Sequence, residues 1–234
     1  MKIILNISDI VAAKVRLLNY RSNDEPENLI RPCALDDWQC IRKYFAANSK
    51  CKPAYGPIPD PLYIDINTMF FPVVNLTVAL PNLVVRGFSG AKIREFYVNR
   101  KSGNLVLVLE VRNLNETSPR AYFRYRRTGK ESIVLADFVT VETSVTFTAV
   151  IPKVPNLRLD LADIHPFAED SVPPLVIGPG AFNSTDPDVV SAAAQFLLQA
   201  PLIGRETLLF QAQLFTAIYI QENICDFGLK LISV

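Results

Sequence analysis

The stretch that decides the fold is ETLLFQAQLFTAIYIQE, residues 206–222, which runs between two glutamates and contains no other charge, no glycine and no proline. Apolar residues recur along it at helical spacing and continue around the helix, so most of its circumference needs an apolar cover. The stretch is shorter than the run of about 20 apolar residues that a bilayer crossing requires, and glutamines interrupt it. We therefore expect a helix without a solvent-facing side, buried inside a protein.

The composition predicts a large core. The chain has 234 residues, half of them hydrophobic, and a formal net charge of +1. This length is enough to bury a substantial core and is compatible with one large domain or two small ones. A balance so close to neutral carries no signature of nucleic-acid or anionic-membrane binding. We expect no nucleic-acid partner, no stable membrane insertion and a monomer.

The middle of the chain alternates between apolar and polar residues, as β-strands do. In residues 141–151 the alternation places Val141, Val145 and Phe147 on an apolar face. Glu142 and the other polar residues fall on the opposite, wet face. Residues 157–161 repeat the alternation and predict one more strand. Short turns between successive strands indicate antiparallel pairing, because parallel crossovers need a dozen residues or more.

Helices are expected on both sides of these strands. Before them, Asp36 or Asp37 can cap a short helix. After them, residues 166–187 form a loop with at most a short strand. A helix then starts at Pro187, and Pro201 with Gly204 ends it before the final helix. The expected fold class is α+β, with a long C-terminal helix wrapped by a strongly curved antiparallel sheet and a short N-terminal helix.

The N-terminus and the cysteines bear on export. Residues 1–28 are either a residual signal region or an exposed lead-in to a single domain at 29–234, because polar residues interrupt the early apolar run. Four cysteines allow three pairings, and the short loop between Cys33 and Cys40 favours that pair, which leaves Cys51 with Cys225. Reduced thiols in a cytosolic core are the alternative. The candidate glycosylation sequons are at Asn75, Asn115 and Asn183.

Several short motifs follow one another in an order that resembles a known family. They are Cys33-x6-Cys40, Gly56-x-Ile58-x-Asp60-Pro61-Leu62, Leu83-Val84-Val85-Arg86-Gly87-Phe88-Ser89 with Lys92-Ile93, and the closing apolar helix. In this order and spacing the chain resembles the insect takeout and juvenile-hormone-binding proteins. The resemblance implies a helix wrapped by a curved sheet with an elongated apolar tunnel. It also implies secretion, into insect haemolymph, as a carrier of one terpenoid or lipid-like ligand such as juvenile hormone.

The candidate tunnel walls are side chains on the apolar faces of the strands or on the helices. They are Trp38, Phe45, Phe123, Phe138, Val145, Phe147, Phe210, Gln211, Leu214, Phe215 and Tyr219. For each apolar member, ordinary core packing is the commoner explanation. Tyr219, Gln211, Gln213 and Thr216 need hydrogen-bond partners when buried, which either the protein or an ester, epoxide or carboxyl of a ligand can supply.

Catalytic motifs are missing from the sequence. Its one histidine, His165, precedes Pro166 in an expected loop, and no nucleophile elbow, phosphate-binding loop or zinc-ligand pattern occurs. We therefore expect no enzyme, no cofactor and no metal. The alternative to a carrier is a lipid-surface or partner-binding protein whose core is filled with its own side chains.

Overall fold

The computed structural model describes residues 28–72, 75–127, 130–168, 176–177, 185 and 187–229, with some side chains in these ranges left undescribed. The strands are β1 (Leu29–Ile30), β2 (Lys52–Pro53), β3 (Leu62–Phe71), β4 (Leu76–Arg86), β5 (Lys92–Asn99), β6 (Asn104–Arg127), β7 (Lys130–Ile151), β8 (Asp163–Ala168), β9 (Val176–Ile177) and β10 (Cys225–Asp226). The helices are α2 (Trp38–Ala47), α3 (Pro187–Tyr219), the short η2 (Phe88–Gly90) and η3 (Leu159–Leu161), and the π-helix η4 (Ile220–Ile224). Except for Asn28, the expected lead-in lies outside the described residues, as does Asn183.

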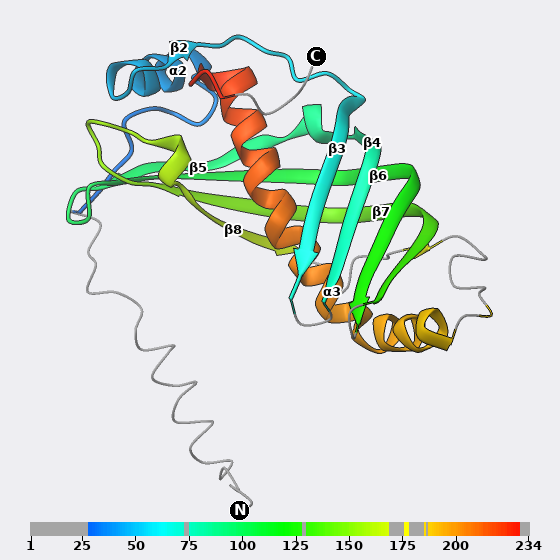
Figure 1. Cartoon of the computed structure of the whole chain (residues 1–234). Coiled ribbons are helices and arrows are strands. Elements are labelled where there is room, and N and C mark those ends of the chain that lie inside the picture. Colours follow the sequence, from blue (N-terminus) through cyan, green and yellow to red (C-terminus); the bar gives the residue numbers. More distant parts are fainter. Residues whose placement is uncertain are drawn as a thin grey trace, which may run out of the picture.

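A long hairpin of β6 and β7 is the spine of the main sheet (Figure 1). The two strands pair from Leu105 opposite Ile151 to Arg127 opposite Lys130. β5 pairs with the first part of β6 and β4 with its second part, while β8 and β9 lie on the other side of β7. β3 follows β4 at the end of the strand order. These pairings are all antiparallel, which confirms the prediction.

The hairpin bends where the partner of β6 changes from β5 to β4. Asn113 has a φ of +55° at this point, and the side-chain alternation shifts, because Val111 and Leu114 are both fully buried. Gly87 packs directly against the bend: a Cβ on Gly87 would lie 2.6 Å from the carbonyl oxygen of Asn113. Only glycine fits here, because the space is closed and its φ is +84°.

The bend also overturns the prediction for the faces of residues 141–151. Val145 and Phe147 are fully buried as expected, but Val141 is 41% exposed and Glu142 is buried, as is Ser144. β7 follows β6 residue by residue through the bend, so the reversal in β6 is carried into β7. Strict alternation assumes a regular strand and fails where the strand is kinked.

Two motifs that carry the takeout resemblance meet beside this bend. The Asp60 carboxylate accepts a hydrogen bond from the Gly87 N–H at 3.1 Å and another from the Ser89 hydroxyl at 2.6 Å. The segment that leads into β3 is thereby joined to the segment that follows β4. Between the two donors, Phe88 is fully buried.

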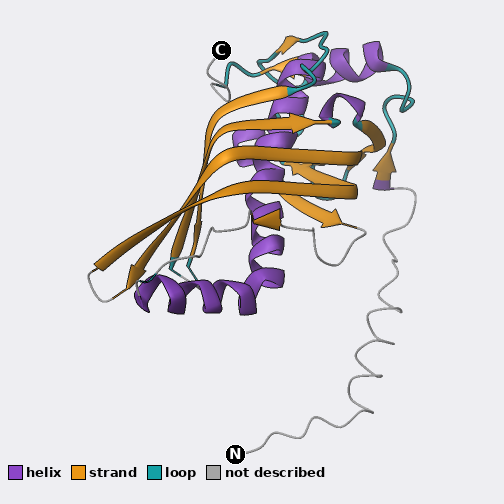
Figure 2. Cartoon of the chain, turned by 90° about the vertical axis from the view of Figure 1, so that its right-hand side faces the viewer, coloured by secondary structure: helices purple, strands orange, loops and turns teal. Residues whose placement is uncertain are grey.

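The helix α3 is a single bent helix (Figures 1 and 2). It runs without interruption over Pro187–Tyr219, so the prediction of two helices separated at Pro201 and Gly204 is wrong. A proline inside a helix removes one hydrogen bond and kinks the axis, which bends a helix without necessarily ending it. The C-terminal part of α3 crosses the concave side of the partly curled sheet and contacts β3, β6, β7 and β8. The predicted fold class is confirmed.

Two short segments differ from the prediction. Residues 157–161 contain the 3-10 helix η3 in place of a strand, and His165 with Pro166 belongs to the strand β8, not to a loop. Among the described strands, β8 pairs only with β7. A proline fits there because one side of an edge strand needs no N–H donor.

The N-terminal helix and the end of α3 are held together at one end of the sheet. Asp37 caps α2 as predicted, and its side chain accepts a hydrogen bond from the Cys40 N–H at 2.9 Å. The disulfides are Cys33–Cys40 and Cys51–Cys225, the pairing that the sequence favours. The second one joins the segment after α2 to β10, which pairs with β2. In the described part of the chain, no helix is long and apolar enough to cross a membrane.

The contact at the bend predicts a large effect of Gly87→Ala. We expect a loss of about 2–4 kcal/mol in the free energy of unfolding, because the new methyl group meets a backbone oxygen at a position that also requires positive φ. Gly103→Ala is the matched control, since Gly103 has a φ of +70° but nothing within 4 Å of the added Cβ. There we expect only about 1 kcal/mol. Urea unfolding measures both values, and equal losses would contradict a role for the Asn113 contact.

Candidate functional site

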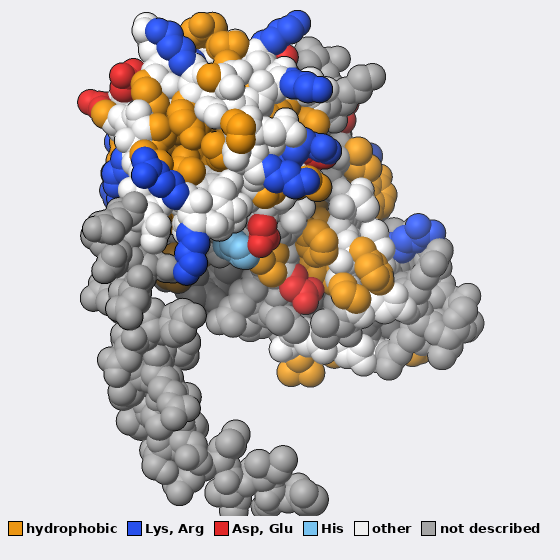
Figure 3. All heavy atoms as spheres, turned by 90° about the vertical axis from the view of Figure 1, so that its left-hand side faces the viewer, with side chains coloured by type: hydrophobic (Ala, Val, Ile, Leu, Met, Phe, Trp, Pro, Cys, Tyr) orange, Lys and Arg blue, Asp and Glu red, His pale blue; other side chains and the backbone are white. Residues whose placement is uncertain are grey.

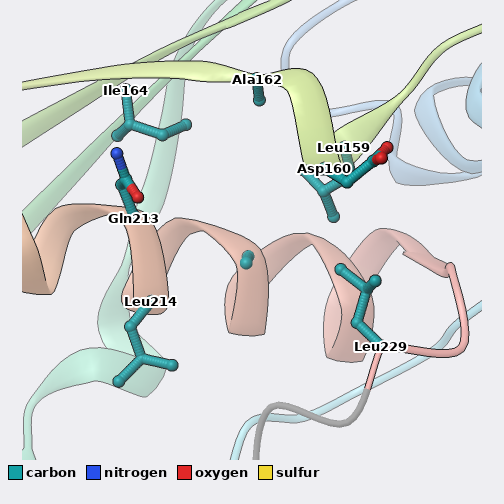
Figure 4. Close-up of a pocket in the computed structure, with 8 residues that line it drawn as sticks. Leu159, Asp160, Ala162, Ile164, Gln213, Leu214 and Leu229 are labelled. Atoms are coloured by element: carbon teal, nitrogen blue, oxygen red, sulfur yellow. The ribbon is translucent and has the colours of Figure 1, made fainter. Parts of the chain in front are cut away.

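A half-open pocket lies between α3 and the segment formed by η3 and β8 (Figure 4). Its volume is about 260 Å³. The lining residues are Leu159, Asp160, Ala162, Ile164, Gln213, Leu214, Ala217 and Leu229. Figure 4 shows Ile164 and Gln213 facing one another across the space. The lining is mostly aliphatic, so the pocket suits an apolar group with one hydrogen-bonding end near Gln213.

The charged side chain at the pocket rim, Asp160, is already paired with Arg158. The guanidinium of Arg158 donates to the carboxylate of Asp160, with Nε at 2.7 Å. These hydrogen bonds lower the pKa of Asp160, and the positive charge of Arg158 adds to the effect. Asp160 is therefore an ionised, paired group at neutral pH and not a proton donor for a ligand.

The pocket exists because one side of α3 is left open. Leu209 and Phe210 are 51% and 46% exposed, Gln213 is exposed, and Leu214 is only partly buried. This corrects the expectation of a helix without a solvent-facing side. The open side is nonetheless mostly apolar, which is why the sequence reads as apolar all round.

Most of the predicted wall residues lie in the core and pack on one another. Phe45, Phe123, Val145, Phe147, Phe215 and Tyr219 are at most 1% exposed. The ring of Phe215 lies 5.2 Å from that of Phe88 and 6.4 Å from that of Phe147, measured between centroids. Leu214 is the predicted residue that lines the pocket. The side chain of Phe138 lies outside the described residues.

Trp38 and Phe210 lie at the margins of this core. The Trp38 ring is 6.3 Å from the ring of Tyr219. The ring of Phe210 contacts the end of β3, with its centroid 5.8 Å from that of Phe71. Trp38 therefore lies toward one end of α3, and Phe210 lies on its partly open side.

Two of the buried polar residues of α3, Gln211 and Tyr219, have partners within the protein, whereas the hydroxyl of the buried Thr216 has none among the described residues. Gln211 donates from Nε2 to the carboxylate of Glu116, and the Tyr219 hydroxyl donates to the Ala91 carbonyl at 3.3 Å. Burial raises the pKa of Tyr219, while the charge of Arg42 lowers it. Sequence reasoning missed Glu116, because a glutamate in a strand is ordinarily assigned to the wet face.

The only histidine does not form a catalytic arrangement with the groups described around it. Its Nε2 lies 3.0 Å from Asp163 Oδ2, and the two side chains are 62% and 73% exposed. Figure 3 shows acidic and basic side chains scattered over this face of the molecule. Within the described residues, no group of histidine, cysteine, aspartate or glutamate side chains is arranged to hold a metal ion.

Comparison with known proteins assigns the chain to a family. Residues 29–229 match Fibroin P25. The chain belongs to the Fibroin P25 family. The chain is also similar to Fibrohexamerin of Galleria mellonella, with 25% identity over 202 residues, 86% of this chain and 90% of that protein.

The solved structures include a takeout protein. The chain aligns with Takeout 1 of Epiphyas postvittana over 81% of its own length and 93% of that chain, with 13% identity and a TM-score of 0.47.

The packing of α3 predicts losses of stability of different size for two phenylalanines on the same helix. Phe215→Ala removes a fully buried ring and is expected to lower the free energy of unfolding by about 3–5 kcal/mol. Phe210→Ala, the control, removes a ring that is 46% exposed and should cost about 1 kcal/mol. Thermal and urea unfolding of the two variants compare them. A small effect at Phe215 would mean that its ring borders a void.

Proposed function

We propose that this protein is secreted, catalyses no reaction, and binds a fibroin-type polypeptide through apolar side chains on its outer surface. The observation that carries the proposal is the match to Fibroin P25 over residues 29–229, to which the name of the relative Fibrohexamerin adds support. The interior of the protein is consistent with such a role, because the aromatic side chains on the concave side of the sheet pack against one another.

The apolar side chains in question lie on β3, which ends the strand order. Tyr63, Ile66 and Phe70 are 62%, 61% and 49% exposed. Asp65 is the only charged residue in this strand. Two strands away, Tyr122 of β6 is 40% exposed. We call Tyr63, Ile66 and Phe70 the outer stripe. Contiguous exposed apolar surface marks interaction sites, and its low charge suits an uncharged, extended partner.

Removing the outer stripe should weaken binding to fibroin. The triple variant Tyr63→Ser, Ile66→Ser, Phe70→Ser is expected to raise the Kd for regenerated silk fibroin at least about tenfold, equivalent to about 1.4 kcal/mol. Leu161→Ser is the control, because Leu161 is 47% exposed but lies in η3. Calorimetric titration of each full-length variant measures the difference. Wild-type protein that does not bind fibroin would overturn the proposed function.

A second candidate function is the transport of a small lipophile, which the pocket beside α3 favours. Its volume of about 260 Å³ is close to the lower end of ligand pockets, about 300 Å³. A terpenoid such as juvenile hormone, or a short lipid, would place its chain against Leu159, Ile164 and Leu214. The amide of Gln213 would donate to its ester or epoxide oxygen. The ligand of such a carrier would lie in this half-open pocket and not in the elongated tunnel that the resemblance implies.

The carrier hypothesis predicts that filling the pocket abolishes uptake. Ala217→Leu adds three carbon atoms to a residue of the lining and should weaken binding of the fluorescent probe N-phenyl-1-naphthylamine at least about tenfold. Ala194→Leu is the matched control on an exposed part of α3. Probe titration of both variants, with solvent extraction and mass spectrometry of the purified wild type, tests the hypothesis. Equal probe affinity in both variants would exclude this pocket.

Secretion and glycosylation complete the proposal. The two disulfides support an extracellular location. Of the described sequon residues, Asn75 is exposed in the turn between β3 and β4. Asn115 lies within β6, and its buried Oδ1 has no hydrogen-bond partner. We therefore assign a glycan to Asn75 and none to Asn115, because the transferred sugar needs an accessible surface turn.

A further inference from the structure

Two glutamates lie buried on neighbouring strands under α3. Glu116 of β6 is 2% exposed and Glu142 of β7 is 4% exposed. The register of the hairpin places Glu116 opposite Thr140 and Leu114 opposite Glu142. The two acids are therefore one step apart diagonally along the ladder, on the face that the helix covers. Buried carboxyl groups this close cannot both ionise without a large loss of hydration and mutual repulsion.

The helix contacts this pair directly. Gln211, which is 3% exposed, donates a hydrogen bond to the carboxylate of Glu116. Thr207, one turn earlier on α3, is 8% exposed and lies on the same side of the helix. A change in the protonation state of Glu116 therefore acts directly on the part of α3 around Gln211.

Burial and the neighbouring acid keep a proton on Glu116. Loss of hydration, followed by the charge of Glu142, raises the pKa of Glu116 to about 8, while the hydrogen bond from Gln211 acts in the opposite direction. The pKa of a glutamate in an unfolded chain is about 4.3. At neutral pH the folded protein thus holds a proton that the unfolded chain has lost.

The described charged groups on the surrounding elements do not offset the shift at Glu116. Arg112 of β6 is 69% exposed and forms an ion pair with Glu110. Arg86 of β4 is exposed and lies opposite Asn115. Glu206 of α3 is partly exposed and is itself an acid. Among the described residues, no cation contributes to the shift at Glu116.

We propose that Glu116 and Glu142 form a proton-operated latch, which holds α3 against the sheet while Glu116 is protonated and loosens α3 around Gln211 when Glu116 ionises. The helix moves rather than the strands because β6 is hydrogen-bonded to β4 on one side and to β7 on the other, whereas α3 is held by side-chain packing. Moving the helix lets water reach the ionised pair, which relieves the loss of hydration.

The direction of the pH effect follows from proton linkage. A group whose pKa is higher in the folded than in the unfolded protein stabilises the fold fully below the unfolded value. That contribution is lost as the pH rises through the folded value. The latch is therefore closed in acid and opens as the pH rises from about 4 through about 8. The same part of α3 carries Leu214 and Ala217 of the pocket, so opening also changes the pocket.

Hydrogen exchange of the full-length protein at pH 6 and pH 9 tests the latch. After correction for the intrinsic exchange rates, amide protection in a peptide covering residues 205–215 is expected to fall at least about tenfold in the wild type, the effect of one pKa unit. Glu116→Gln replaces the acid by a neutral side chain of the same shape, and protection should then be independent of pH. A wild-type peptide equally protected at both pH values would overturn the proposal.

Two further variants make the test specific. Glu95→Gln removes an exposed acid of β5 that pairs with Arg31, and it should keep the wild-type pH dependence. Glu142→Gln removes the neighbouring charge, so the loss of protection should shift to lower pH and become smaller. This variant decides the matter if Glu116→Gln does not fold, because an unchanged midpoint would overturn the proposal. The proposal would also be overturned if the Glu116→Gln protein folds and its amide protection depends on pH as in the wild type.

Discussion

The close approach of Gly87 to the backbone of Asn113 is the constraint on which the architecture depends. β6 has one set of partners before this point and another after it, and the change of direction lets one continuous hairpin contribute to both parts of the sheet. Without the bend, the concave surface under α3 would be flat, and a helix laid on a flat sheet leaves most of its circumference in water. Asp60 supports the same point by joining the segment before β3 to Gly87 and Ser89.

The two sides of α3 both carry apolar residues, but one side is buried against the sheet and the other is partly exposed. The side of α3 that faces the sheet packs aromatic rings against those of β7 and η2 and leaves them almost without solvent contact. The opposite side keeps Phe210 partly exposed beside the end of β3 and Leu214 partly buried beside η3 and β8. Single apolar side chains at this exposure are ordinary on a protein surface, so this side of α3 needs no further cover to be stable.

The sequence predicts the elements better than their faces. The long apolar helix, the antiparallel strands, the Asp37 cap and the Cys33–Cys40 bond are local or short-range signals, and the structure has them all. The Cys51–Cys225 bond spans 174 residues and was predicted only as the remaining pair. The buried Glu142 and the exposed Val141 could not be predicted, because they depend on a kink that Asn113 sets in the partner strand. The pocket was missed for a related reason, since η3 and β8 take their places from packing against α3.

The dependence of side-chain faces on long-range packing also explains why most of the predicted wall residues are core residues. Residues such as Phe215 and Tyr219 were selected for being apolar or polar at buried positions, and burial alone does not separate a core residue from a ligand contact. Whether a residue of α3 is core or a ligand contact depends on which side of the helix lies against the sheet. That orientation is set by contacts with residues far away in the sequence. Leu214, one position before Phe215, lines the pocket while its neighbour is sealed in the core.

The Cys51–Cys225 disulfide has a consequence for assembly. It closes a covalent ring that contains the whole main sheet from β3 onward and all of α3. Two copies of an intact, oxidised chain therefore cannot exchange this helix by unfolding and refolding into each other, because a closed ring cannot release one end. Oxidised molecules can therefore associate only through the surfaces of their folded state. Helix swapping is possible only between chains that associate before this disulfide forms.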